Sequence, residues 1–200
     1  MIAIIDYGAG NIFSVKNALD YLGVENKLTA DKNEICAADE IILPGVGAFP
    51  WAMKMLRDSG LVDTIREEAR KKPFLGICLG MQLIFDNGYE FEETDGLRLI
   101  GGKVEKIDRK DMIIPHMGWN ELEINRDCPI LKGLPEHPYV YFVHSYAAVC
   151  DDANVSAYCD YGGKITALVH DGAYVYGAQF HPEKSGEVGL QMLRNFAELA

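Results

Sequence analysis

The chain has 200 residues, of which 48% are hydrophobic and 24% are charged, a composition that predicts one globular domain over residues 1–200 and excludes an intrinsically disordered chain. Its formal net charge of −11 argues against nucleic acid as the main partner, because phosphate binding is driven largely by Lys and Arg releasing counterions. No apolar run approaches the roughly 20 residues that span a bilayer, so no membrane association is expected.

The first ninety residues alternate between strand-like and helix-like segments. A β-branched run over 2–6 is followed by apolar residues at helical spacing as far as Gly23. Further strands are expected at 24–28, 40–43 and 73–77, and helices at 51–57, 61–71 and 79–85. Strands separated by helical crossovers predict a three-layer α/β fold with a mostly parallel central sheet. In such sheets the chemistry lies beyond the carboxyl ends of the strands.

The second half of the chain is richer in strands than in helices. Strands are expected at 103–107, 121–124, 139–144, 155–158, 165–169 and 174–180, and a helix at 186–198 closes the chain. Because few helices separate these strands, they are interpreted as antiparallel additions that extend the central sheet or pack beside it.

The sequence predicts neither a disulfide framework nor a metal site nor a cofactor. The five cysteines are scattered and form no C-x-x-C pair. Free thiols in a reducing compartment are therefore expected, which places the chain in the cytoplasm. A glycine-rich turn begins at Gly8, but Phe13 stands where a dinucleotide-binding G-x-G-x-x-G loop has its third glycine.

The sharpest local feature is the G-x-C-x-G of residues 76–80, placed where a buried strand gives way to a helix. In the G-x-S-x-G nucleophile elbow, small flanking residues permit a strained turn that lifts the nucleophile out of the sheet, and here cysteine replaces serine. A thiol at a helix N-terminus is favoured as thiolate, and the N–H of Leu79 then points where an oxyanion would form. From this pentapeptide alone, Cys78 as an inert core cysteine is an equally good interpretation.

A cysteine nucleophile needs a base and a group that orients the base. The segment QFHPE at 179–183 supplies both at the end of an apolar strand. His181 and Glu183 lie two residues apart in extended chain, so both side chains can project from one face. The glutamate can then hold the imidazole in the required tautomer, as the acid does in the serine triads.

A third motif, PGVGAF at 44–49, also follows a strand. Its two glycines allow a backbone N–H to turn toward a bound ligand at little steric cost. Taken alone, this motif is better explained as a simple strand-to-helix turn.

The motifs PGVGAF, GICLGMQL and QFHPEKS, in this order and spacing, resemble those of the class I (triad) glutamine amidotransferases. Within that family the chain looks most like the glutaminase subunits of imidazole glycerol phosphate synthases. The further matching segments are IIDYGAGNIFSV near the start, PHMGWN at 115–120 and YFVHSY at 141–146. The resemblance spans essentially the whole chain and implies a single glutamine amidotransferase domain that hydrolyses glutamine through a cysteine thioester.

The resemblance also implies a role for each matching position. The catalytic triad would be Cys78, His181 and Glu183. The oxyanion would be held by backbone N–H groups of Leu79 and of a loop that is thought to rearrange, at Val46 or Gly47. The amino acid end of glutamine would be held by Gln82, Glu90, Ser145 and Tyr146. The residues that face a partner would be Asn11, Trp119, Tyr141 and Lys184.

By resemblance, the partner is the cyclase subunit of imidazole glycerol phosphate synthase, which uses ammonia to make imidazole glycerol phosphate and aminoimidazole carboxamide ribotide in histidine biosynthesis. Ammonia in water near neutral pH is mostly protonated and not nucleophilic, so a heterodimer that passes it on directly is expected. Three alternatives stay open: a glutaminase subunit for another pathway (surface sugars, anthranilate or pyridoxal phosphate), a cysteine hydrolase on the same scaffold, and a non-catalytic binding module.

Overall fold

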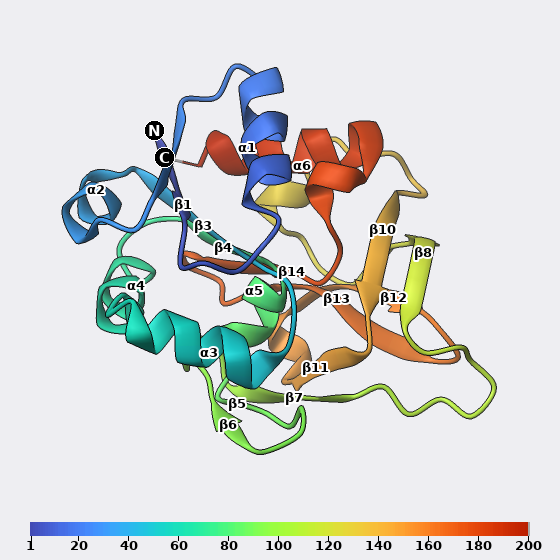
Figure 1. Ribbon diagram of the computed structural model, residues 1–200. Coiled ribbons are helices and arrows are strands. Elements are labelled where there is room, and N and C mark those ends of the chain that lie inside the picture. Colours follow the sequence, from blue (N-terminus) through green and yellow to red (C-terminus); the bar gives the residue numbers. More distant parts are fainter. Residues whose placement is uncertain (200) are drawn as a thin grey trace.

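A computed structural model describes residues 1–199 and shows three layers, with helices on both faces of a central sheet (Figure 1). The sheet has eight strands in the order β2-β1-β3-β4-β14-β13-β12-β9. Its parallel part consists of β1 (Ile2–Ile5), β2 (Asn26–Thr29), β3 (Glu40–Gly45), β4 (Phe74–Cys78) and β14 (Val175–Ala178). Its antiparallel extension consists of β13 (Lys164–His170), β12 (Val155–Asp160) and β9 (Glu123–Ile124). The predicted fold class is therefore confirmed, but the prediction was wrong for β14, which runs parallel to β4.

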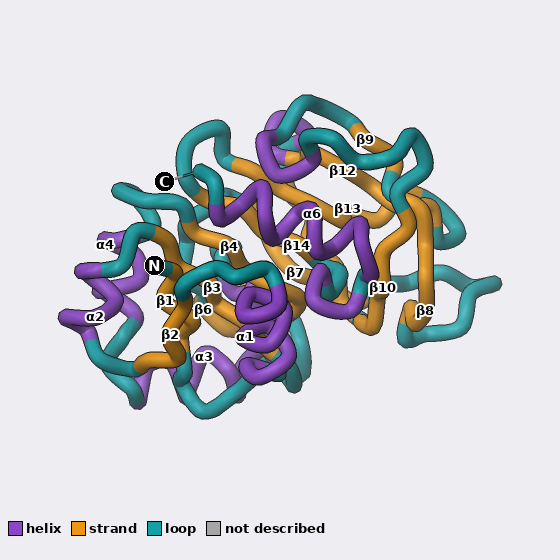
Figure 2. The backbone as a smooth tube through the Cα atoms, turned by 90° about the horizontal axis from the view of Figure 1, so that it is seen from above, coloured by secondary structure: helices purple, strands orange, loops and turns teal. Residues whose placement is uncertain are grey.

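The helices divide between the two faces of the sheet, and Figure 2 shows α1 and α6 side by side over one of them. These two helices span Ile12–Tyr21 and Gly186–Ala197. The other face carries α2 (Lys32–Ala37), α3 (Phe49–Asp58), α4 (Val62–Glu68) and α5 (Leu79–Leu83). Three short 3-10 turns cover Pro129–Leu131 (η1), Asp152–Asn154 (η2) and Pro182–Lys184 (η3). None of the helices within residues 1–199 is long and apolar enough to cross a membrane.

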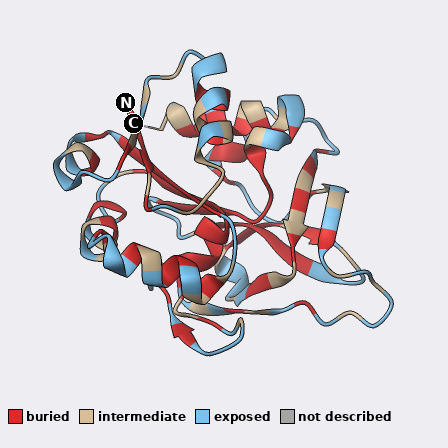
Figure 3. Cartoon of the chain, in the orientation of Figure 1, coloured by how far each residue is buried: buried red, intermediate tan, exposed pale blue. Residues whose placement is uncertain are grey.

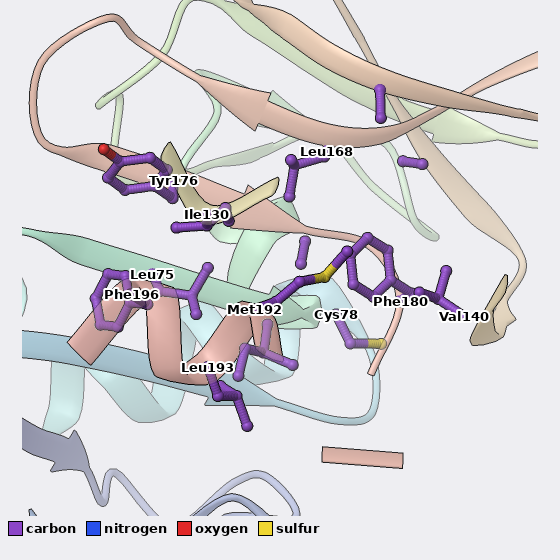
Figure 4. Close-up of a cluster of buried hydrophobic side chains, with 14 of the residues drawn as sticks. Leu75, Cys78, Ile130, Val140, Leu168, Tyr176, Phe180, Met192, Leu193 and Phe196 are labelled. Carbon is purple, nitrogen blue, oxygen red and sulfur yellow. The ribbon is translucent and has the colours of Figure 1, made fainter. Parts of the chain in front are cut away.

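Two hydrophobic cores form because side chains alternate across the strands. Ile42 of β3 joins the core under α1 and α6, whereas its neighbours Ile41 and Leu43 join the core under α3, α4 and α5. Figure 3 shows the central strands as almost wholly buried. In Figure 4, Leu193 and Phe196 of α6 lie over β4 in the first of these cores.

Two smaller sheets pack beside the central one. The first is a ribbon of two antiparallel strands, β8 (His116–Glu121) and β10 (Tyr139–His144). The second contains β11 (Tyr146–Cys150), β7 (Gly102–Lys106), β5 (Asn87–Gly88) and β6 (Thr94–Asp95). The added strands of the second half thus both extend the central sheet and pack beside it, as expected.

Three glycines bring α5 against β3 and β4 more closely than side chains would allow. A Cβ on Gly80 would lie 1.8 Å from the carbonyl oxygen of Leu43, and one on Gly76 would lie 2.6 Å from that of Gly80. A Cβ on Gly45 would lie 2.7 Å from the amide nitrogen of Gly80. As a result β4 passes directly into α5 at Cys78, whose φ of 55° and ψ of −111° form a sharp, strained turn.

We expect Gly80→Ala to lower the free energy of unfolding by about 3 kcal/mol or more, because the added methyl would overlap the backbone of β3. Urea denaturation monitored by circular dichroism measures the change. Gly101→Ala is the matched control, since only a side-chain oxygen of Asp86, at 3.8 Å, comes near a Cβ at that position. Equal stability of the two variants would contradict the close approach described above.

Candidate active site

The carboxyl ends of β3 and β4 open into a cavity of about 350 Å³. Its walls are Val46, Gly47, Cys78, Leu79, Gln82, Glu90, Pro115, Val143, His144, Ser145, Tyr146 and His181. The structure therefore brings together all the residues predicted to hold the oxyanion and the substrate, along with the predicted nucleophile and base. A larger hollow beside Trp51 and Phe91 contains none of the residues predicted for catalysis, oxyanion or substrate.

Cys78 stands at the strained turn between β4 and α5. Its side chain is 7% exposed and forms part of the cavity wall. The sulfur lies 3.9 Å from the carbonyl oxygen of Val143 and 4.0 Å from Nε2 of Gln179. A nucleophile presented in this way can be reached only from the cavity, which selects for a ligand that fits the walls.

His181 and Glu183 form a buried pair behind the thiol. Nδ1 of His181 lies 2.8 Å from Oε1 of Glu183, and the two side chains are 3% and 1% exposed. Burial lowers the pKa of His181, but the Cys78 thiol and the Glu183 carboxylate outweigh this effect and raise it to about 9. The ring is therefore protonated at neutral pH. Its buried Nε2 makes no close hydrogen bond among residues 1–199, and Cys78 is near enough to act on its proton, so that N–H is available to a group that reacts at the sulfur.

Hydrogen bonds to β10 of the ribbon hold the backbone around His181 in place. Its N–H donates to the carbonyl oxygen of Tyr141 over 2.9 Å. The hydroxyl of Ser185 donates to the carbonyl of His181 over 2.6 Å and accepts from the N–H of Tyr141 over 3.0 Å. The base is thus held by both its side-chain partner and its main chain.

The loop after β3 faces Cys78, because Gly45 pairs with Cys78 in the sheet register. Val46 is 45% exposed, and Gly47 adopts a φ of +102°, which favours glycine. The glycine-rich turn after β1 packs here as well: a Cβ on Gly10 would lie 3.4 Å from the backbone of Pro44. A Cβ at that distance would make ordinary contact, so it is the φ of +120° at position 10 that favours glycine.

The predicted substrate residues are tied to their surroundings. Gln82 donates from Nε2 to the carbonyl oxygen of Tyr146 over 3.1 Å and to Oε1 of Gln179 over 3.0 Å. Oε2 of Glu90 accepts from the N–H of Phe49 over 2.8 Å, at the start of α3 and next to the 45–47 loop. Gln179, which is fully buried, was not among the predicted site residues. Its place two residues before His181, on the same side of an extended chain, is the signal that could have found it.

The predicted partner-facing residues lie around the outer side of the ribbon. Trp119 is 56% exposed and stands opposite Tyr141, with ring centroids 6.2 Å apart. The Trp119 ring reaches within 3.9 Å of the place a Cβ on Gly186 would take, close to the exposed Lys184. Helix α1, which Asn11 precedes, packs against the η3 turn that contains Lys184.

The described part of the chain, residues 1–199, contains no group of three or more His, Cys, Asp or Glu placed to hold a metal ion. All five cysteines are free thiols.

Comparison with known proteins supports the resemblance that the sequence motifs indicate. The sequence profile described as glutamine amidotransferase class-I matches residues 3–199. The imidazole glycerol phosphate synthase subunit HisH of Bacillus cereus (strain G9842) is 52% identical over 197 residues, covering 98% of this chain and 93% of that protein. The subunit of the same name from Listeria monocytogenes serotype 4a (strain HCC23) is 48% identical over 201 residues, covering 100% and 96%.

Solved structures agree on the fold. A crystal structure of a glutamine amidotransferase superposes with a TM-score of 0.77 at 23% identity, covering 100% of this chain and 98% of the other. The structure of PurLQS from Thermotoga maritima gives a TM-score of 0.75 at 21% identity, covering 98% and 96%. On the family profile and the sequence identity, the chain belongs to the class-I glutamine amidotransferases.

Proposed function

We propose that this chain is the glutaminase subunit of an imidazole glycerol phosphate synthase. It hydrolyses L-glutamine to L-glutamate and ammonia, and passes the ammonia to a cyclase subunit in a heterodimer that serves histidine biosynthesis. The observation that carries the proposal is the meeting of Cys78 and His181 in one cavity, with Glu183 paired to the far side of the His181 ring, in a chain 52% identical to a HisH subunit. Two cores on one continuous sheet support a single domain over residues 1–200.

In the first half of the reaction, the thiol proton of Cys78 passes to Nε2 of His181. The sulfur attacks the side-chain amide carbon of glutamine and forms a C–S bond. The N–H of Leu79 and one from Val46 or Gly47 hold the developing oxyanion. Because its raised pKa leaves His181 protonated at neutral pH, the ring can donate its Nε2 proton to the departing nitrogen. The C–N bond breaks, and ammonia leaves behind a glutamyl thioester.

In the second half, His181 is neutral and its Nε2 accepts a proton from water. The resulting hydroxide attacks the thioester carbon, and the C–S bond breaks to give glutamate and the Cys78 sulfur. Glu183 stabilises the protonated ring and keeps Nδ1 as its own partner, so Nε2 is the nitrogen that exchanges protons in both halves. Gln82, Glu90, Ser145 and Tyr146 form the wall that holds the amino acid end of glutamine.

The cyclase docks on the outer side of the β8–β10 ribbon. Three large side chains there are about half exposed or more: Met117, Trp119 and Tyr139. Together with Tyr141 they give the ribbon an apolar outer side, of the kind that marks a protein interface, and Lys184 and Asn11 supply polar groups at its edge. The free thiols fit a reducing compartment, so we place the complex in the cytoplasm.

We expect Cys78→Ser to lower glutamine turnover on the order of 10³-fold or more, since a serine hydroxyl is a much weaker nucleophile than a thiolate in this setting. Glutamate release is measured with and without a candidate cyclase, and the wild-type chain alone is expected to be much slower than the complex. Cys36→Ser, which changes an exposed thiol, is the control. Full activity of Cys78→Ser would refute the nucleophile.

We expect the ring of His181 to titrate with a pKa of about 9, and both Cys78→Ala and Glu183→Gln to lower this pKa, because each removes a group that raises it. Since the folded pKa is above its ordinary value of 6.5, the protonated ring stabilises the folded chain fully below pH 6.5, and this stabilisation is lost as pH rises through about 9. Nuclear magnetic resonance of the imidazole signals, over a pH range from about 5 to about 11, measures the pKa of His181 in the wild type and in both variants. An unchanged pKa in Glu183→Gln would show that the carboxylate does not act on the ring.

We expect Trp119→Ala to weaken binding of the cyclase by about 30-fold, because a half-exposed Trp at the centre of a patch is a typical hot spot. Titration calorimetry and co-purification measure the loss. Trp51→Ala is the matched control, since that side chain is 66% exposed on α3, away from the ribbon. If both variants bind as the wild type does, the ribbon is not the interface.

A further inference from the structure

Two buried histidines beside the cavity take no part in the reaction described above. His116 of β8 and His144 of β10 stand opposite one another in the ribbon and are 2% and 6% exposed. We propose that His116 and His144 are positioning residues, which hold the cavity wall at 143–146. Through this wall they also hold the side-chain amides of Gln82 and Gln179 beside Cys78. This proposal rests on the glutaminase function proposed above.

The hydrogen bonds of the pair fix where its protons lie. The carbonyl oxygen of Tyr146 can only accept, so Nδ1 of His144, 2.8 Å away, carries the hydrogen. Burial lowers the pKa of each ring to about 4, so both rings are neutral at pH 7. Nε2 of His144 is therefore an acceptor, and Nδ1 of His116, 3.0 Å away, donates to it. Nε2 of His116 in turn accepts from Nδ2 of Asn120 over 3.4 Å.

The outer end of this series is anchored by Asn120. Its Oδ1 accepts from the N–H of Glu121 over 2.8 Å, while Nδ2 donates to the carbonyl oxygen of Asp160 over 2.8 Å. These two contacts fix the orientation of the amide, since a flipped amide would lose both. The donors of the series, on Asn120, His116 and His144, therefore all point toward the cavity. Only the tautomer of His116 with its hydrogen on Nδ1 satisfies both of its neighbours.

The inner end reaches the nucleophile. The carbonyl oxygen of Tyr146 accepts from both His144 and Gln82, so both of its lone pairs are used. Gln82 also donates to Oε1 of Gln179, which turns Nε2 of Gln179 toward the sulfur of Cys78 at 4.0 Å. Without the hydrogen bond from His144, the Tyr146 carbonyl would be held less firmly. The cavity wall against which glutamine binds would then lose its fixed position.

The His116 ring both stacks on its neighbours and donates a hydrogen bond, and two substitutions distinguish these roles. Its ring stacks on Phe142 at 4.6 Å and on Tyr161 at 4.0 Å, with interplanar angles of 22° and 24°. His116→Phe keeps a stacked ring but has no donor for His144. His116→Asn loses the ring but can place an amide N–H near the position of Nδ1. The two variants therefore predict opposite results for a positioning role and for a packing role.

The test is glutamine turnover by each variant in the complex with the cyclase, with KM and kcat measured separately. His116→Phe is expected to raise KM for glutamine about tenfold, the loss expected for one hydrogen bond, and to leave kcat within about threefold. His116→Asn is expected to stay within about threefold of wild type in both. An unchanged KM in His116→Phe, or a larger KM in His116→Asn than in His116→Phe, would overturn the proposal. Absence of glutamine turnover in the wild-type complex would instead refute the proposed function.

A second measurement does not depend on how well the variants fold. In the wild-type chain labelled with ¹⁵N-histidine, both His116 and His144 are expected to be neutral at pH 7 with the hydrogen on Nδ1. Nitrogen chemical shifts distinguish the two tautomers directly. A hydrogen on Nε2 of either ring, or a charged ring at pH 7, would overturn the proposal even if every variant were unstable.

Discussion

The site depends on how closely α5 approaches β3. Because Gly80 has no side chain, the helix begins immediately after β4 and lies against the backbone of Leu43. This contact accompanies the positive φ of Cys78, which pairs with Gly45 at the start of the loop at 45–47. β14 runs parallel beside β4 and ends at the same edge, so His181 is delivered to the thiol without a special connection. One steric constraint therefore determines where the nucleophile stands, and sheet topology brings the base to it.

The parallel core was predictable because its strands are continuous apolar runs bounded by glycine and proline. The elements that were missed have weaker signals. Helix α2 has six residues and buries only Ile35, so its sequence shows no helical period. β8 exposes Met117 and Trp119, which hides the alternation of a strand. The direction of β14 could not be inferred from its own residues, since the chain returns to the sheet centre beside β4 and direction is a property of that distant pairing.

The candidate site was predictable where chemistry and local sequence coincide. Cys78 lies in a motif whose glycines are required by the close approach of α5 to β3 and β4. His181 and Glu183 are two residues apart, a spacing that brings their side chains together. The contact between His116 and His144 carries no such local signal, and the local signal of Gln179 is limited to its place two residues before His181. These residues become neighbours through strand register and sheet packing, which link residues 28 and 101 positions apart. Short-range patterns therefore identify the reacting groups better than the groups that hold them in place.

The β8–β10 ribbon separates two sets of side chains. Its residues alternate, so Trp119 and Tyr141 face outward while His116 and His144 face inward. Substitutions on the outer side leave the inner hydrogen bonds in place, because the two sets of side chains project from opposite faces of the ribbon. The backbone hydrogen bond from His181 to Tyr141 is a connection that both sides share. A shift of the ribbon's register by one residue would therefore exchange its two faces, and would separate His116 from His144 and turn Trp119 inward.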